Sequence, residues 1–212
     1  MADDFELPQI YLVTPPVIDL DTFPARLDAV LQAHDIACLR LALAGTDEDE
    51  TARTADALRE IAHRHDVAIV IDRHVMLAQR LGLDGVHLLD GREVRAARKT
   101  LGEDAIVGAF GGTSQHDGML AGEAGADYIT FGPAGDTALG QGDSAPQDLF
   151  DWWSKVVELP VVAEGGLTPD VIRRLTPVTD FFAIGDEIWR SDDPVAALSD
   201  LLAVMQQVGA AG

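Results

Sequence analysis

Residues 69–94, IVIDRHVMLAQRLGLDGVHLLDGREV, set the pattern that decides the fold. Two short apolar runs, at 69–71 and 85–89, are followed at once by Asp72 and Asp90. A segment of helical period separates the two runs. A buried strand, a helix and a second buried strand in this order are typical of a parallel sheet whose faces are both covered.

The same unit repeats along the chain. Each strand candidate is nearly continuous in apolar residues, and the candidates lie at 9–13, 36–43, 67–71, 85–89, 105–110, 127–131, 160–164 and 180–184. Eight units of roughly 26 residues predict an α/β fold, a single small (β/α)8 barrel. The predicted domain covers residues 1–212, and a doubly wound open sheet is the alternative.

Helix starts support this arrangement. Thr46 is placed to cap a helix that runs to about residue 65, with acidic residues in its first turn. Thr168 precedes Pro169 at the start of another helix, and Asp193 precedes a proline in the same way. Proline is favoured at the first helical position, because its missing N–H would be unpaired there in any case.

Composition excludes several classes of partner. The chain has 15 Lys and Arg against 36 Asp and Glu, a formal net charge of -21. This charge argues against nucleic acid and against anionic membranes as partners. The single cysteine, Cys38, fits a reducing compartment. With no signal peptide evident and no apolar run near the roughly 18 residues of a membrane span, we predict a cytoplasmic protein.

Active sites of such barrels lie at the carboxyl ends of the strands. This rule brings Arg40, Asp72, Arg73 and Asp90 to one mouth. We interpret Arg40 and Arg73 as candidate catalytic residues and Asp72 and Asp90 as candidate Mg²⁺ ligands, since Mg²⁺ prefers carboxylate oxygens. Alternatively, Asp72 pairs with an arginine and Asp90 only caps the following helix.

The turns after the last two strands contain glycines, Gly165 and Gly166 after one and Gly185 after the other. Phosphate sites of barrels are often built there, from backbone N–H groups at a helix start. With Thr113 after the fifth strand, these residues predict a phosphate site. The alternative is that the glycines only make tight turns, and the acids at 186–187 would repel a phosphate.

Two further residues are candidates for substrate binding. Gly132 follows the sixth strand and opens a long irregular stretch, residues 132–147, which is either a binding loop or a surface excursion. His87 lies within the fourth strand, where an interior histidine with its hydrogen bonds satisfied is the alternative.

Several segments resemble thiamine-phosphate synthases and their thiazole-tautomerase relatives. They are YLVTP (11–15), LR (39–40), DRHVMLAQRLGLDGVHL (72–88), EAGADYITFGP (123–133) and PVVAEGGLTPDVI (160–172). The resemblance implies a (β/α)8 barrel. It also implies an enzyme that uses Mg²⁺ to join a pyrimidine pyrophosphate to a thiazole phosphate, with release of pyrophosphate.

The functional motifs of that family are only partly present. Of its Gln-x-Arg-x-Lys pattern after the second strand, only Arg40 remains. Its Asn-Asp metal pair is Asp72-Arg73 here, and its second metal aspartate corresponds to about Arg92, with Asp90 slightly earlier. An arginine offers a planar, permanently charged donor fork. Arg73 therefore either replaces Mg²⁺ as the partner of an anionic substrate or neutralises the two aspartates.

Other motifs are absent. The Ser-Thr-His type of turn after the fifth strand reads FGGT at 110–113, and the phosphate-holding loop after the sixth, 134–143, has no lysine. The Val-Ser step after the last strand is Ile184-Gly185, and the tautomerase histidine is Pro133.

Three functions are consistent with these observations. The first is a thiamine-phosphate synthase with divergent contacts. The second is a different small-molecule enzyme on the same barrel, and the third is a non-catalytic protein that binds a phosphorylated ligand. The first and third predict a small phosphorylated ligand, and the second predicts a phosphorylated or carboxylated one; the resemblance allows a homo-oligomer.

Overall fold

The computed structural model describes residues 6–45, 47–137 and 144–210. In these ranges eight parallel strands pair in chain order and close into a barrel. The strands are β1 (Gln9–Val13), β2 (Cys38–Leu41), β3 (Ala68–Asp72), β4 (Gly85–Leu88), β5 (Ile106–Gly112), β6 (Tyr128–Phe131), β7 (Val161–Glu164) and β8 (Phe181–Ile184). The predicted (β/α)8 barrel is confirmed, and the open sheet is excluded because β1 pairs with β8.

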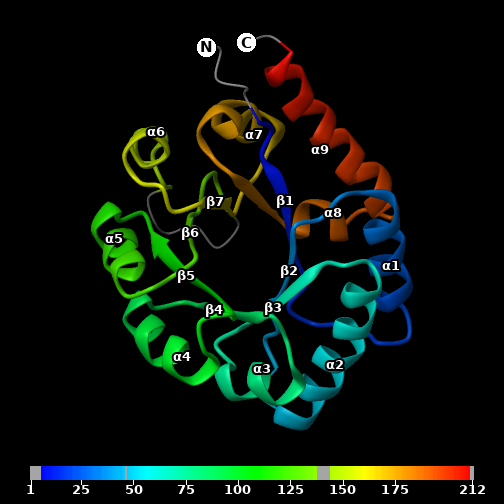
Figure 1. Ribbon diagram of the computed structural model, residues 1–212. Helices are drawn as coiled ribbons and strands as arrows, with labels where there is room; N and C mark the ends of the chain where they lie inside the picture. The colour runs from blue at the N-terminus through cyan, green and yellow to red at the C-terminus, as the bar shows by residue number, and fades with distance from the viewer. Residues whose placement is uncertain (1–5, 46, 138–143, 211–212) are drawn as a thin grey trace.

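Helices surround the strands on the outside, as Figure 1 shows. They are α1 (Phe23–Ala33), α2 (Glu48–Arg64), α3 (Val75–Leu81), α4 (Val94–Leu101), α5 (Gln115–Glu123), α6 (Gln147–Val156), α7 (Pro169–Leu175), α8 (Asp186–Trp189) and α9 (Pro194–Gly209). Two 3-10 turns, η1 (Gly91–Glu93) and η2 (Thr176–Val178), complete the set. In the described part of the chain, no helix has the length and apolar character needed to cross a membrane.

The predicted caps hold at two helices. The Thr168 side chain accepts a hydrogen bond from the Val171 amide at the start of α7, and Asp193 accepts one from the Ala196 amide at the start of α9. The cap of α2 is Asp47, whose carboxylate accepts from the Glu50 amide. Thr46, the predicted cap, lies outside the described residues.

The barrel interior holds a small polar layer within an apolar lining. The hydroxyls of Tyr11 on β1 and Tyr128 on β6 lie 2.5 Å apart, and Nδ1 of His87 on β4 lies 3.2 Å from the Tyr128 hydroxyl. Gly108 on β5 lies so close to the Tyr128 side chain that an added Cβ would overlap its ring. Burial and the charge of Arg40 lower the pKa of His87 well below its ordinary value, so its imidazole is neutral.

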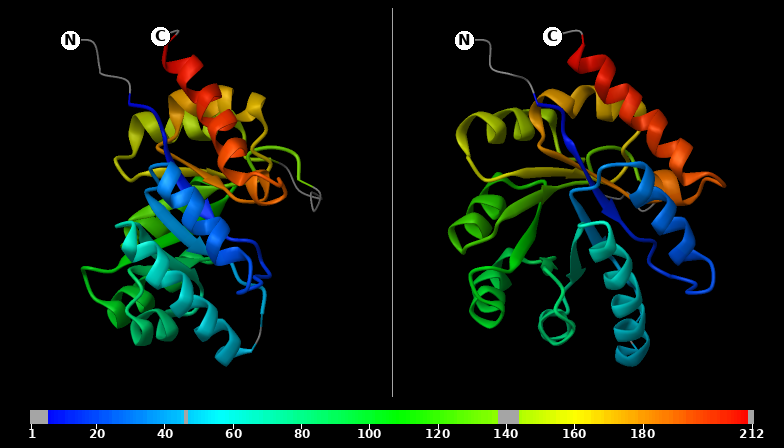
Figure 2. Two further views of the ribbon diagram at one scale, coloured as in Figure 1. Left: turned by 90° about the vertical axis from the view of Figure 1, so that its right-hand side faces the viewer. Right: turned by 45° about the vertical axis from the view of Figure 1, so that its right-hand side comes forward.

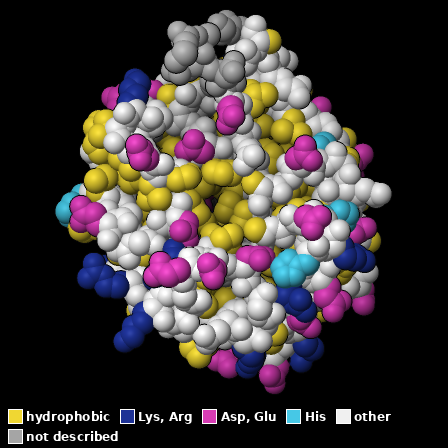
Figure 3. Space-filling view, in the orientation of Figure 1, with side chains coloured by type: hydrophobic (Ala, Val, Ile, Leu, Met, Phe, Trp, Pro, Cys, Tyr) yellow, Lys and Arg dark blue, Asp and Glu magenta, His cyan; other side chains and the backbone are white. Residues whose placement is uncertain are grey.

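The two ends of the barrel differ in role. In Figure 2 the helices lie beside the strands and return toward the end of the barrel where the strands begin. The start of β1 and the end of α9 both lie at that end. Figure 3 looks onto this end, where apolar side chains gather at the centre and carboxylates are scattered around them. The carboxyl ends of the strands, which carry the candidate site, face away from the viewer in that picture.

Candidate functional site

Arg40 is the centre of the site. Its side chain leaves β2 and contacts both the neighbouring strand β3 and the more distant strand β7. Nε donates to Oδ1 of Asp72 at 2.7 Å, and a terminal nitrogen lies 3.3 Å from Oδ2 of the same carboxylate. The other terminal nitrogen donates to Oε2 of Glu164 at 2.7 Å. The buried guanidinium therefore holds two carboxylates.

Burial and charge oppose one another in this triad. Burial raises the pKa of Asp72, while the adjacent charge and hydrogen bonds of Arg40 lower it, and the net direction is upward. Burial disfavours the charge on Arg40, but Glu164 and Asp72 outweigh it and raise the pKa well above its ordinary value. The guanidinium is therefore permanently charged. With two carboxylates around it, the triad is negative overall when both are ionised.

One cavity of about 640 Å³ unites Arg40 with three of the predicted phosphate-binding glycines. Gly165 and Gly166 enter it from the turn after β7, and Gly185 enters it from the turn after β8. Both glycines after β7 have positive φ, 79° and 67°, which side-chain-bearing residues rarely adopt. The predicted gathering of these turns around Arg40 is therefore found in the structure.

The other predicted binding residues are placed differently. Thr113 lines a separate cavity, of about 480 Å³, beside η1. Gly132 packs against Glu164, and an added Cβ would lie 2.5 Å from the Glu164 carbonyl oxygen. His87 is fully buried in the barrel interior, where Nδ1 bonds to the Tyr128 hydroxyl but Nε2 has no partner among the described residues, so the alternative of a satisfied interior histidine holds only in part. Its ring does not reach a cavity that we find in the described residues.

Asp90 lies apart from Asp72, near the surface. Its carboxylate accepts from the Arg92 backbone amide at 3.0 Å and forms a close ion pair with the Arg92 guanidinium. The side-chain hydrogen bond from Arg92 is the main reason that the pKa of Asp90 falls from 3.8 to about 2. Asp90 thus caps η1, as the alternative interpretation of this residue states.

We expect Arg92→Ala to raise the pKa of Asp90 from about 2 part of the way to 3.8, because the backbone hydrogen bond remains. Since folding lowers this pKa, the contribution of Asp90 to stability is present above 3.8 and is lost as the pH falls through about 2. Carboxyl NMR titration measures the change. Arg173→Ala, which breaks another surface pair, serves as the control and leaves Asp90 at about 2. An unchanged pKa in Arg92→Ala would contradict the assignment.

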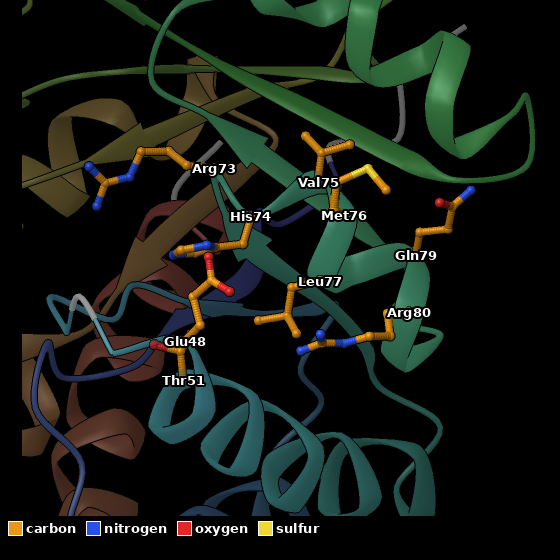
Figure 4. A pocket seen from close by; sticks show the side chains of 9 residues that line it. All are labelled: Glu48, Thr51, Arg73, His74, Val75, Met76, Leu77, Gln79 and Arg80. Atoms are coloured by element: carbon orange, nitrogen blue, oxygen red, sulfur yellow. The ribbon is translucent and has the colours of Figure 1, made fainter.

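Arg73 is exposed and has a positive φ of 65°. It lines a third cavity, of about 520 Å³, formed with the start of α2 and with α3. In Figure 4 its side chain extends away from the other labelled residues, whereas His74 and Glu48 face one another. The ion-pair partner of Asp72 is Arg40, and that of Asp90 is Arg92. Arg73 therefore forms no ion pair with either aspartate, although its charge contributes to lowering the pKa of Asp72.

Comparison with known proteins identifies the family. The family model for thiamine monophosphate synthase matches residues 10–183. The chain belongs to the thiamine monophosphate synthase family. It is 39% identical to the thiamine-phosphate synthase of Erythrobacter litoralis, over 97% of this chain and 98% of that protein. It is 37% identical to the thiamine-phosphate synthase of Rhodospirillum centenum, over 93% and 98% of the two chains.

Solved structures confirm the barrel. The thiamine phosphate pyrophosphorylase from Pyrococcus furiosus superposes with a TM-score of 0.80 at 22% identity, covering 94% of this chain and 96% of that one. A 3-hexulose-6-phosphate synthase shares the fold with a TM-score of 0.65 at 18% identity, covering 92% and 99%. At these identities the likeness concerns the fold alone.

The candidate ligands Asp72 and Asp90, which lie beside the family's metal positions, do not fit Mg²⁺ in this arrangement. A Mg²⁺ site requires carboxylate oxygens that converge and are free to bind the ion. Both Asp72 oxygens accept from Arg40, and both Asp90 oxygens accept from Arg92. Across the described residues, no three acidic, histidine or cysteine side chains gather as a metal site would need. In this chain, arginine side chains therefore bind the carboxylate oxygens that a metal ion would need.

Sequence reasoning missed three parts of the site. Glu164 is the second partner of Arg40, a contact that no local pattern in the sequence indicates. The pairing of Tyr11 with Tyr128 was not foreseen. Glu187 was considered only as a source of repulsion, whereas its carboxylate accepts from two backbone amides. An acid two residues into a helix that follows a glycine is the signal that could have revealed the last contact.

Proposed function

We propose that this protein carries out a condensation of the thiamine-phosphate synthase type in the Arg40 cavity. A hydroxymethylpyrimidine pyrophosphate is joined to a thiazole phosphate, and pyrophosphate is released. The observation that carries the proposal is 39% identity, over nearly the full length of both chains, to a protein named thiamine-phosphate synthase. Arg40, the residue that the chain keeps from the family's pyrophosphate pattern, supports it by lining the main cavity at the strand ends.

The reaction separates charge, so the site must stabilise both the leaving pyrophosphate and the cation that develops on the pyrimidine. The C–O bond to pyrophosphate breaks and its electron pair leaves with the pyrophosphate. The lone pair of the thiazole nitrogen then forms the new C–N bond to the pyrimidine methylene carbon. A fixed carboxylate near that carbon stabilises the cation that develops on it, because preorganised charge costs no reorganisation during the step. Glu164 lies in the cavity, held by Arg40, and is suited to this role.

The leaving group requires positive charge and hydrogen-bond donors. Arg40 uses three of the five N–H donors of a guanidinium on Asp72 and Glu164, so two remain without a protein acceptor in the described ranges. Arg73 adds an exposed charge at the end of β3 that forms no ion pair with a described residue. We propose that Arg40 and Arg73 hold the pyrophosphate. Because Asp72 and Asp90 do not fit Mg²⁺, we assign no step to a metal ion.

A second function is favoured by one observation. Asp72 and Asp90, the candidate metal ligands beside the family's metal positions, are both engaged by arginines. A small-molecule binding protein that performs no turnover, or an enzyme that acts on a different ligand, would need no metal at these positions. Ligand binding without product formation would distinguish a binding protein from the condensation.

The test is turnover by the purified chain. The protein is supplied at a concentration near that of the substrates, with hydroxymethylpyrimidine pyrophosphate and thiazole phosphate. We expect a coupled thiamine product and stoichiometric pyrophosphate, with and without added Mg²⁺. Because Asp90 lies outside the Arg40 cavity, Asp90→Asn should show the same dependence on Mg²⁺ as the unmodified chain. Absence of thiamine phosphate among the products would overturn the proposal.

We also propose a cytoplasmic location and a homo-oligomeric state for this protein. The first is supported by the lone Cys38, which is buried on β2 and has its pKa raised to about 12 by burial. Such a thiol is protonated and unreactive, as suits a residue that only packs. Light scattering of the purified chain tests the oligomeric state.

A further inference from the structure

Two polar atoms in the barrel interior have no hydrogen-bond partner among the described residues. They are Nε2 of His87 on β4 and Oγ1 of Thr130 on β6, and both side chains are fully buried. Burying a donor or acceptor without a partner is costly, and such atoms are rare in native proteins. A partner for these two atoms therefore has to come from outside the chain.

Both residues lie at the same depth in the barrel as Arg40. In an eight-stranded barrel the side chains of one interior layer come from alternate strands. The strand registers place one such layer on β2, β4, β6 and β8, and it consists of Arg40, His87, Thr130 and Ala183. Arg40 and Ala183 line the Arg40 cavity. His87 and Thr130 therefore lie level with the wall of that cavity, on other strands of the same layer.

The neighbouring hydroxyls determine which of the two atoms donates. Among the described residues, the Tyr11 hydroxyl is hydrogen-bonded only to the Tyr128 hydroxyl, at 2.5 Å, and the Tyr128 hydroxyl also lies 3.2 Å from Nδ1 of His87. Every hydroxyl proton of this chain of contacts has an acceptor if Tyr11 donates to Tyr128 and Tyr128 donates to Nδ1. The proton of the neutral imidazole then lies on Nε2. Nε2 is therefore a donor, and Oγ1 of Thr130 is able to accept.

We infer that His87 and Thr130 recognise the aminopyrimidine ring of the donor substrate. Nε2–H of His87 donates to a ring nitrogen, and the exocyclic amino group beside that nitrogen donates to Oγ1 of Thr130. An imidazole and a hydroxyl without charge suit an uncharged ring, whereas the charged groups at the mouth suit its pyrophosphate. This inference rests on the proposed condensation and names the residues that select its pyrimidine.

Arg40 controls access to this layer. Asp72 and Glu164 are the last residues of β3 and β7, which lie opposite one another in the closed barrel. Because the Arg40 guanidinium bonds to both carboxylates, it spans the barrel on the mouth side of His87 and Thr130. Glu164 is the more exposed partner, and phosphate oxygens accept from the same guanidinium donors. The ring reaches the layer when Arg40 keeps Asp72 and turns from Glu164 toward the pyrophosphate.

The experiment is a binding measurement with two ligands, hydroxymethylpyrimidine pyrophosphate and its analogue in which hydrogen replaces the amino group. We expect the unmodified chain to bind the amino compound at least about 10-fold more tightly in titration calorimetry, because the analogue cannot pair with Oγ1 of Thr130. Thr130→Val keeps the shape of the side chain without its hydroxyl. It should bind the amino compound at least about 10-fold more weakly, with the preference over the analogue reduced to within about 3-fold. An unchanged preference in Thr130→Val would overturn the inference.

His87→Asn tests the second contact. The asparagine amide can lie near the position of Nδ1 and keep the hydrogen bond with Tyr128, but it has no counterpart of Nε2. It should weaken the binding of both pyrimidines by a similar factor, about 10-fold, because both carry the ring nitrogen. Unweakened binding of both ligands would refute the role of Nε2. If this variant does not fold, Thr130→Val alone decides the inference.

Stability separates recognition from a structural role. Because Oγ1 of Thr130 has no partner in the described part of the free protein, Thr130→Val should leave Tm unchanged or raise it. Thr176→Val is the matched control, since it removes a buried hydroxyl that donates to the Ile172 carbonyl at 2.7 Å. It should lower Tm and leave the ligand preference unchanged. If a trapped water pairs Thr130 permanently, Thr130→Val would instead behave like this control, and the inference would be wrong.

These results are independent of turnover. If the unmodified chain shows the expected preference but forms no thiamine phosphate, the condensation fails and the recognition of the ring stands. If thiamine phosphate is formed and Thr130→Val keeps the preference, the condensation stands and the inference about His87 and Thr130 fails. Absence of binding of either pyrimidine to the unmodified chain also overturns this inference.

Discussion

Replacing Arg40 with alanine should lower the free energy of unfolding by about 3–5 kcal/mol, because two carboxylates would remain in the barrel without their partner. The side chains of Arg40 and Asp72 are only 9% and 11% exposed, and that of Glu164 is 21% exposed. Water therefore cannot replace the lost charge effectively. For a chain of this size the loss corresponds to a fall in Tm of roughly 6–20 °C, measurable by calorimetry or by urea unfolding.

The control for Arg40→Ala is an arginine whose ion pair is exposed. Arg92 is 88% exposed beside Asp90, so Arg92→Ala should lower the free energy of unfolding far less than Arg40→Ala does. In the double variant Arg40→Ala with Asp72→Asn, one stranded carboxylate is gone and part of the stability should return. Equal losses for the two arginine variants would show that the triad is not held by buried charge.

The loss in Arg40→Ala should depend on pH in a definite direction. Burial already raises the pKa of Asp72 in the folded protein, and Arg40 is the main influence that lowers it. Without Arg40 the folded-state pKa rises further. A raised pKa stabilises the folded state below the unfolded value and loses this contribution as the pH rises through the folded value. The difference between variant and parent should therefore be smaller near about pH 5 than near about pH 8.

Gly108→Ala should cost at least about 3 kcal/mol, because overpacking and the loss of buried hydrogen bonds add together. An added Cβ on β5 would lie 1.9 Å from Cζ of Tyr128 and 2.3 Å from its hydroxyl oxygen. The Tyr128 ring has little freedom to move, because its hydroxyl is hydrogen-bonded to the Tyr11 hydroxyl and to the His87 imidazole. Moving it would leave both partners buried without a bond. Urea unfolding measures the loss.

Two comparisons make the Gly108 prediction specific. At Gly45 the nearest atom to an added Cβ is 3.9 Å away, so Gly45→Ala should be close to neutral. Tyr128→Leu removes the atoms that Gly108→Ala would strike. Combining the two should therefore cost little beyond Tyr128→Leu alone, a strong departure from additivity. Additive losses would mean that the close approach of β5 to Tyr128 does not limit this position.

Much of the fold could be predicted from the sequence. Strand candidates at 67–71 and 85–89 became β3 (Ala68–Asp72) and β4 (Gly85–Leu88), within one residue at each end. Nearly continuous apolar runs, punctuated by caps such as Thr168, determine where strands and helices lie, and short connections fix the order of parallel strands. Because active sites of this architecture lie at the strand ends, the region of Arg40 and the glycine turns followed from the order alone.

The partners of the charged residues could not be predicted in this way. Arg40 and Glu164 are 124 residues apart in the chain, on strands that do not pair, and their contact exists only because the barrel closes. Asp72 and Asp90 look equivalent in sequence, yet Asp72 points at Arg40 and Asp90 binds the Arg92 side chain and amide at the surface.

The physical reason is that the two kinds of interaction act over different distances along the chain. Apolar periodicity and caps act over a few residues, so the sequence by itself determined the strands, the helices and which loops meet at the mouth. Which donor reaches which carboxylate depends on the tilt and stagger of the closed barrel and on side-chain conformations fixed by packing. Only the tertiary structure could decide that arginines hold the candidate metal ligands and that Glu187 lies between the turns expected to bind phosphate.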